Sequence, residues 1–324
     1  MSEKRKQEIV MPDQQITVGI PKAMLYHRYR ALWKLFFTKL GVNLVYSPDT
    51  NRKILEEGED VANSEACLSM KIFMGHVNYL IGKCDYILVP RISNFGIRRV
   101  MCTRFSALYD ICCNTFRESG QKFLAYNVDY QHHIDEEDAF VRMAKELGYS
   151  WRDATKAYKS ARKEFDTYRK EQIKKEEKKY QSKRFKILLA AHSYVLNDPY
   201  VGKPVTDMLR SMDCTVIRAD LADPKKCRKL SADFSKTLKW EMSREIVGGI
   251  EMHKKDVDGI VLLSAFPCAP DAMVNDMIMR RNQQHKIPIL HMTVDAQSGT
   301  AGIETRLESF VDIIRLQGEK NGKR

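Results

Sequence analysis

The alternation of two kinds of apolar periodicity constrains this chain more than any other feature. Residues 16–20 (ITVGI) form a short β-like segment. In residues 21–41, which follow, apolar side chains recur at helical spacing up to Gly41: Met24, Leu25, Leu32, Leu35, Phe36 and Leu40. Residues 42–48 (VNLVYSP) then alternate like a second strand. Strands separated by single helices are typical of a parallel sheet with helices on both faces, so the sequence predicts an α/β fold.

The same alternation continues to about residue 128 and reappears after a charged interval, for example in the apolar segments 185–194 (FKILLAAHSY) and 257–266 (VDGIVLLSAF). We therefore predict two Rossmann- or flavodoxin-like parallel-sheet domains that face a central cleft and are joined by a long charged helix. The predicted boundaries are an N-terminal domain, a connector helix and a C-terminal domain at 16–150, 151–184 and 185–316. The sequence contains no glycine-rich phosphate loop of the P-loop or dinucleotide type.

The formal net charge of +12 is concentrated in the connector. Residues 152–184 contain 13 Lys and Arg against 6 Asp and Glu, and most of the remaining excess lies in the two tails. No basic strand rich in aromatic residues and no recognition motif accompanies this charge, so the pattern favours a solvated helix over a nucleic-acid footprint. Association with nucleic acid through the connector is therefore the weakest of the functions that we consider for this chain.

The N-terminal residues 1–15 are charged and polar and lack an apolar signal region. No segment of the chain is apolar enough for a membrane span, so we expect a cytoplasmic protein without membrane contact. Eight cysteines are scattered along the 324 residues, a usage typical of reduced thiols or metal ligands.

Three of these cysteines fall where ligands bind in parallel sheets, in loops that lead from a strand to a helix N-terminus. They are Cys67 (NSEACLSMKI), Cys102 (RRVMCTRF) and Cys268 (SAFPCAPDAM). The N–H groups at helix N-termini are expected to lower a thiol pKa and to stabilise an anionic iron–sulfur cluster. Pro267 and Pro270 restrict the backbone on both sides of the third thiol. Spacing alone fits incidental thiols equally well, because no CxxC pair is present.

The other five cysteines are interpreted as structural, because free cysteine is among the most frequently buried residues. One of them, Cys227, is expected in a charged loop (PKKCRK); the others are Cys84, Cys112, Cys113 and Cys214.

Several phrases, in this order, resemble a known family: VGIPKAMLYHRYRALWKLFFTKLG, NSEACLSMKIFMGHV, DYILVPRI, MCTRF, HSYVLNDPYV, DGIVLLSAFPCAPDAM and TVDAQSGTAGIETRLESFVDII. Over residues 16–316 the chain is similar to the acyl-CoA dehydratase activase-related family (DUF2229). That family is related to 2-hydroxyacyl-CoA (2-hydroxyglutaryl-CoA) dehydratase subunits and to double-cubane cluster proteins. Longer members carry an ATPase activator domain of the acetate-kinase-like class, for which this sequence has no counterpart.

The resemblance implies an oxygen-sensitive protein with a [4Fe–4S] or double-cubane iron–sulfur cluster, held by Cys67, Cys102 and Cys268. Three protein thiolates would leave one iron for an exogenous or bridging ligand. The implied activity is low-potential electron transfer or reduction, as a component of an ATP-dependent reductase or dehydratase. The implied partners are an ATPase activator of the acetate-kinase-like class, an acyl-CoA or other small-molecule substrate, and related subunits of an oligomer.

Other polar residues near these motifs are weaker catalytic candidates: His192, Ser264 and Glu65. Asp271 lies close to the third thiol, and for it, as for Glu65 and Ser264, helix capping is the favoured interpretation. After the second thiol, relatives have a proline-containing CPKF phrase where this chain has Thr103 and Arg104, so we expect a looser turn at Cys102. The main alternative function is a non-catalytic protein of the same fold that binds a partner or acyl-CoA, without a cluster or with zinc.

Overall fold

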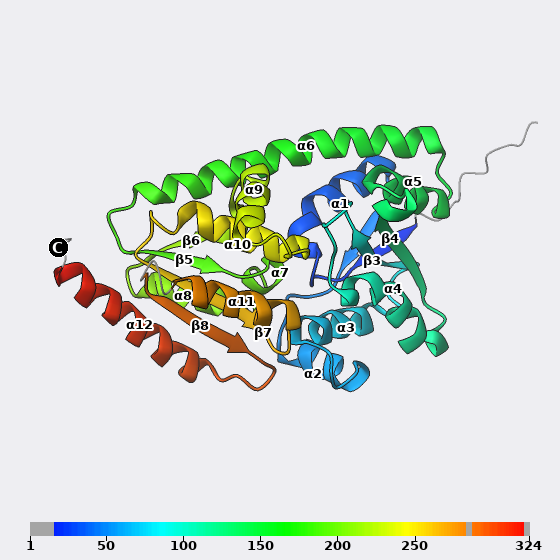
Figure 1. Cartoon of the computed structure of the whole chain (residues 1–324). Coiled ribbons are helices and arrows are strands. Elements are labelled where there is room, and N and C mark those ends of the chain that lie inside the picture. The colour runs from blue at the N-terminus through cyan, green and yellow to red at the C-terminus, as the bar shows by residue number, and fades with distance from the viewer. Residues whose placement is uncertain (1–15, 283–286, 321–324) are drawn as a thin grey trace, which may run out of the picture.

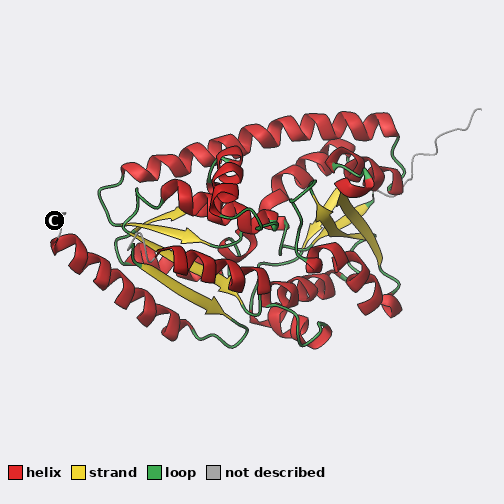
Figure 2. Ribbon diagram, in the orientation of Figure 1, coloured by secondary structure: helices red, strands yellow, loops and turns green. Residues whose placement is uncertain are grey.

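The computed structural model describes residues 16–282 and 287–320 and contains two four-stranded parallel sheets (Figures 1 and 2). The first sheet has the order β2-β1-β3-β4, with strands β1 (Thr17–Ile20), β2 (Asn43–Tyr46), β3 (Tyr86–Asn94) and β4 (Lys122–Asp129). The second has the order β6-β5-β7-β8, with strands β5 (Lys186–Ala190), β6 (Thr215–Arg218), β7 (Gly259–Ala265) and β8 (Ile289–Val294). Both follow the flavodoxin-like order, so the predicted α/β class with two parallel sheets is confirmed.

Helices lie on both faces of each sheet (Figure 2). Those of the first half are α1 (Tyr26–Leu40), α2 (Arg52–Val61), α3 (Leu68–Leu80), α4 (Thr103–Thr115) and α5 (Glu136–Glu146), followed by α6 (Trp151–Lys178). Those of the second half are α7 (Ser193–Leu196), α8 (Gly202–Ser211), α9 (Pro224–Phe234), α10 (Glu241–His253), α11 (Ala269–Asn282) and α12 (Thr300–Lys320). The described residues also form four short 3-10 helices: η1 (Arg117–Ser119), η2 (Tyr130–His132), η3 (Lys179–Gln181) and η4 (Ala219–Leu221).

Burial of the central strands of the second sheet explains why they read as continuous apolar segments. All seven residues of β7 are buried, as are four of the five in β5. Strands covered on both faces have no solvent side, so their sequences do not alternate. The main core joins residues of both halves, for example Phe105 of α4 with Tyr194 of α7, whose ring centroids are 5.8 Å apart.

Helix α6 runs along both halves of the molecule (Figure 1). The Ser150 side chain caps its N-terminus by accepting a hydrogen bond from the Asp153 N–H at 3.2 Å. Small and aromatic side chains face the first half: Ala154, Ala157, Tyr158, Ala161 and Phe165. Near its other end the buried Glu176 carboxylate accepts hydrogen bonds from the Arg218 backbone N–H and the Lys179 ammonium, at 2.7 and 2.8 Å. The helix is therefore tied to both halves, and the division into domains stays a prediction.

Polar side chains connect the two halves directly. Arg28 of α1 forms a two-pronged ion pair with Glu245 of α10, at 2.5 and 2.7 Å. The Thr50 hydroxyl donates to the Asp198 carboxylate at 2.7 Å. No helix among the described residues is long and apolar enough to cross a membrane. Residues 1–15, on which the absence of a signal segment was predicted, lie outside the described range.

Candidate functional site

The three cysteines singled out in the sequence each precede the first residue of a helix. Cys67 and Cys102 are the N-cap residues of α3 and α4, with nearly identical backbone angles of φ −67°, ψ 155° and φ −68°, ψ 154°. Cys268 precedes α11, and its carbonyl accepts the Ala272 N–H at 3.0 Å. The sequence predicted that the Cys67 loop leads directly from a strand to a helix. In the structure α2 lies between β2 and α3, the helix that begins after Cys67.

Hydrogen bonds join the loops that carry these thiols. The Leu68 N–H donates to the Phe266 carbonyl at 2.8 Å, which connects the Cys67 loop to the segment just before Cys268. The Arg104 guanidinium donates to the Glu65 carbonyl at 2.9 Å, which connects α4 to the Cys67 loop. The looser turn expected at Cys102 stays a prediction; in this chain the Arg104 side chain connects the turn to the Cys67 loop.

Tyr194 lies between the three loops. Burial raises its pKa well above the ordinary value, and the negative charges of the ionised Cys268, Asp271, Cys102 and Cys67 raise it further. All four groups therefore lie near the same phenol. Cys102 and Cys268 line a small cavity of about 20 Å³ together with His192 and Tyr194, whereas Cys67 does not line it.

Burial is also the main influence on the thiols and raises the pKa of Cys67, Cys102 and Cys268. The N–H of the third helical residue opposes this effect in each case, although no side-chain capping hydrogen bond forms at Cys67 or Cys102. The expectation that the helix N-termini lower these pKa values is wrong for the net effect. Desolvation exceeds the stabilisation by the N–H groups, so the thiols hold their protons unless a metal replaces them.

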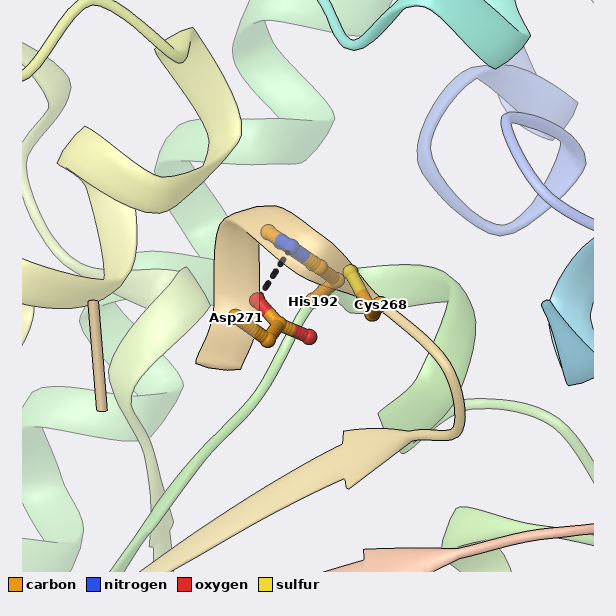
Figure 3. Close-up of side chains that lie close together, drawn as sticks. All are labelled: His192, Cys268 and Asp271. Carbon is orange, nitrogen blue, oxygen red and sulfur yellow. Dashed lines mark ion pairs between the residues drawn. The ribbon is translucent and has the colours of Figure 1, made fainter. Parts of the chain in front are cut away.

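His192 and Asp271 form a buried pair beside Cys268 (Figure 3). The His192 Nε2 atom lies 2.8 Å from Asp271 Oδ1, and the two side chains are only 4% and 6% exposed. One ligand atom from each of the three residues lies within 4.8 Å of the others, a grouping that could hold a metal ion. His192 Nδ1 and Asp271 Oδ2 are buried without a hydrogen-bond partner among the described residues. Such orphaned atoms are uncommon and indicate a place for an additional ligand.

The fold explains why these residues meet. In a sheet of this order, ligands bind where the chain direction reverses, between the first and third strands of the sheet. In the second sheet that point lies between β5 and β7; His192 follows β5, whereas Cys268 and Asp271 follow β7. Sequence reasoning named His192 and Asp271 separately but missed their pairing.

The remaining candidates lie apart from this group. Ser264 is buried within β7, where its hydroxyl lies 3.2 Å from the Thr293 hydroxyl of β8. Glu65 is exposed, and its backbone carbonyl rather than its carboxylate makes the contact with Arg104. Cys227, expected in a loop, is buried in α9.

The model of the family described as CoA enzyme activase uncharacterised domain (DUF2229) matches residues 17–221. No curated protein matches the chain. Similar solved structures include the SBP FpvC from Pseudomonas aeruginosa in complex with Mn²⁺, with 11% identity and a TM-score of 0.30 over 95% of this chain and 100% of that one. The laminin-binding protein Lbp of Streptococcus pyogenes has 14% identity and a TM-score of 0.29, over 91% and 98%. At these TM-scores the structural likeness carries no argument.

The fold and the site define a two-sheet α/β protein with a thiol, an imidazole and a carboxylate grouped at the ends of β5 and β7, an arrangement that could hold a metal ion. By the family match, which spans more than half of its length, the chain belongs to the DUF2229 family of CoA enzyme activase domains. Cys67, Cys102 and His192 lie within the matched residues, and Cys268 and Asp271 lie beyond them.

Proposed function

We propose that this protein binds an iron–sulfur cluster of the [4Fe–4S] type through Cys67, Cys102 and Cys268. The observation that carries the proposal is that all three thiols precede helices, in hydrogen-bonded loops around Tyr194. The donor set fits such a cluster, because thiolates are its usual protein ligands and helix N-termini favour negative charge. The orphaned atoms of His192 and Asp271 also fit a site that receives a further ligand.

A bound cluster of this type supplies one-electron chemistry at low potential, and three protein ligands leave one iron for a substrate or bridging group. The protein's own residues exclude water and place polar groups. Asp271 holds His192 through Nε2, which leaves Nδ1 to exchange a proton with a bound ligand. Tyr194 stacks on the His192 ring at a centroid distance of 5.0 Å and restricts its orientation.

The proposed role is that of an electron-accepting component in a reductase or dehydratase system in the cytoplasm. Family membership supports an activator partner and a CoA-related ligand. We propose that the activator is an ATP-hydrolysing protein of the acetate-kinase-like class and that related subunits form an oligomer with this chain. A double-cubane cluster is the variant of this proposal in which the open iron is bridged.

A second candidate is a non-catalytic partner-binding or acyl-CoA-binding protein in which a single zinc ion takes the place of the cluster. The grouping of His192, Cys268 and Asp271 favours it, because zinc takes nitrogen, sulfur and oxygen ligands together. In this alternative Cys67 and Cys102 carry no metal.

The deciding experiment measures iron, acid-labile sulfide and zinc, with an absorption spectrum, in protein purified without oxygen. We expect stoichiometric iron and sulfide in the wild type and their loss in Cys67→Ser and Cys268→Ser. Cys113→Ser is the matched control, because Cys113 is a partly buried thiol on the helix that Cys102 begins. This variant should keep its iron.

The same measurement separates the two candidates. Under the zinc alternative, His192→Gln and Cys268→Ser lose zinc, whereas Cys67→Ser keeps it. Protein that stays free of iron after anaerobic reconstitution would overturn the cluster proposal.

A further inference from the structure

A second cavity, of about 100 Å³, lies at the junction of the two halves and α6. Its lining contains four arginines, Arg28, Arg30, Arg169 and Arg218, and two carboxylates, Asp220 and Glu245. The volume is several times what one water molecule needs. With His27 of the same lining neutral, these side chains leave an excess of two positive charges.

Both carboxylates are already engaged by two of the arginines. Glu245 pairs with Arg28 at 2.5 and 2.7 Å. Asp220 pairs with Arg218 at 2.6 and 2.9 Å, and a third nitrogen of Arg218 donates to Asn197 at 2.6 Å. No acidic side chain of this lining is left to neutralise the other two arginines.

Arg169 and Arg30 form no hydrogen bond or ion pair with any residue in the part of the chain that the structure describes. Arg30 is exposed at the edge of the cavity, whereas Arg169 is mostly enclosed. Burial and the neighbouring Arg28 charge lower the pKa of Arg169, so the protein itself disfavours this cation. An enclosed cation is costly unless an anion or water compensates it.

Two neutral side chains of the lining also lack partners. The hydroxyl of Ser193, a residue only 7% exposed, and His27 Nε2 are buried without a hydrogen bond to any described residue. Burial, Arg30 and Arg218 lower the pKa of His27 to about 3, so the ring is neutral near pH 7. The Ser193 hydroxyl is a suitable donor to an oxyanion, whereas His27 Nε2 becomes a donor only when the ring takes up its second proton.

We propose that this cavity binds the phosphate group of a small anionic ligand, with Arg169 and Arg30 as its charged contacts, the Ser193 hydroxyl as a neutral donor, and His27 as a ring that the bound anion would help to protonate. Two uncompensated guanidinium groups match a phosphate dianion in charge, and guanidinium donors suit its oxygens. Donors on α1, α6 and α7 approach from different elements, which suits a tetrahedral oxyanion better than a planar carboxylate. The inference goes beyond the proposed function and does not depend on the cluster.

The test titrates the full chain with inorganic phosphate, pyrophosphate and adenosine 5′-monophosphate at constant ionic strength, by calorimetry. We expect saturable binding that weakens at least tenfold in Arg169→Gln. Lys170→Gln is the matched control, because it removes the same charge from the adjacent, exposed position of α6. It should bind within about twofold of the wild type.

Two further readouts separate binding from misfolding. In phosphate-free buffer Arg169→Gln should melt at a higher temperature than the wild type, since it removes an uncompensated cation, and phosphate should no longer raise that temperature. The His27 ring resonances of the wild type should titrate at higher pH when phosphate is present, because a bound anion favours the protonated ring.

The three ligands identify the source of the phosphate. Equal affinity for all three supports free phosphate, and tighter binding of pyrophosphate or the nucleotide supports a phosphate carried by a larger molecule. The proposal is overturned if none of them binds, if Arg169→Gln binds as well as the wild type, or if Lys170→Gln weakens binding equally.

Discussion

Mild acid should destabilise this protein because His76 is buried in its neutral form where the two halves meet. The side chain is fully buried on α3. Its Nδ1 lies 2.8 Å from the Ser47 hydroxyl and its Nε2 lies 3.0 Å from the Thr50 hydroxyl. Since Thr50 donates its own proton to Asp198, it accepts from His76, so the proton is on Nε2. Nδ1 is then the acceptor of the Ser47 proton, and a second proton on the ring would break this contact.

The size of the effect follows from the pKa of His76, which burial, followed by His27 and Lys22, lowers from 6.5 to about 3. The folded pKa lies below the unfolded one, so the unfolded chain takes up the proton first as the pH falls. Stability from this group is complete above the unfolded value and declines below it by about 1.4 kcal/mol per pH unit. Between pH 7 and pH 5 the loss is about 2 kcal/mol.

Two neighbouring groups modify the total. His27, whose pKa is also lowered to about 3, should contribute a similar loss. Asp198 acts in the opposite direction, because burial raises its pKa and the folded state then binds a proton before the unfolded chain does. The His76 contribution is therefore isolated by comparing variants.

The assay is urea unfolding at pH 7, 6 and 5 of the wild type and of His76→Gln, whose amide can donate and accept without titrating. The variant should lose about 2 kcal/mol less than the wild type between pH 7 and pH 5. His132→Gln, at a side chain 76% exposed, is the control and should keep the wild-type dependence. Equal pH dependence in His76→Gln and the wild type would refute the reasoning.

Two other substitutions test contacts that position the site. Glu245→Gln should lower the free energy of unfolding in urea by about 3–5 kcal/mol, since the buried Arg28 loses its carboxylate. Removal of the exposed Arg52–Glu56 pair by Glu56→Gln should cost less than about 1 kcal/mol, and an equal effect of the two changes would contradict this account. Gly75→Ala should lower the melting temperature, because its Cβ would lie 1.9 Å from the Ile54 carbonyl oxygen. Gly302→Ala on α12 is the control: its added Cβ would meet no atom within 4 Å, so it should stabilise the fold by about 0.5–1 kcal/mol. An unchanged melting temperature of Gly75→Ala would rule out the close contact of α2 with α3.

The central strands β5 and β7 could be predicted from the sequence because they are buried on both faces and therefore read as continuous apolar segments, whereas the edge strand β2 has no buried residue and was recognised by its alternation. Helix α9 could not be recognised from the spacing of apolar residues, because its first residues, PKKCRK, contain almost none. Its start was nevertheless encoded: Asp223 caps the helix and Pro224 occupies its first turn. Cys227 and Ser231, four residues apart, form its buried side. Hydrophobic periodicity fails where a helix buries small residues.

The candidate site could be predicted in position but not in its electrostatics. The placement of Cys67, Cys102 and Cys268 before helices follows from local sequence. The net rise of their pKa values does not, because it depends on burial by residues distant in the chain. The pairing of His192 with Asp271 likewise requires the strand order, which sets β5 beside β7.

The two proposed sites are adjacent but chemically separate. His192 and Tyr194 line the small cavity that Cys102 and Cys268 also line. Ser193, between them in sequence, lines the larger cavity that contains four arginines. The first offers ligands whose protons a metal must displace, and the second offers cations that need an anion. Consequently, loss of a thiol should abolish metal binding and leave phosphate binding intact, and loss of Arg169 should do the reverse. A substitution at one site that impaired both would instead show that the short helix α7 transmits changes between them.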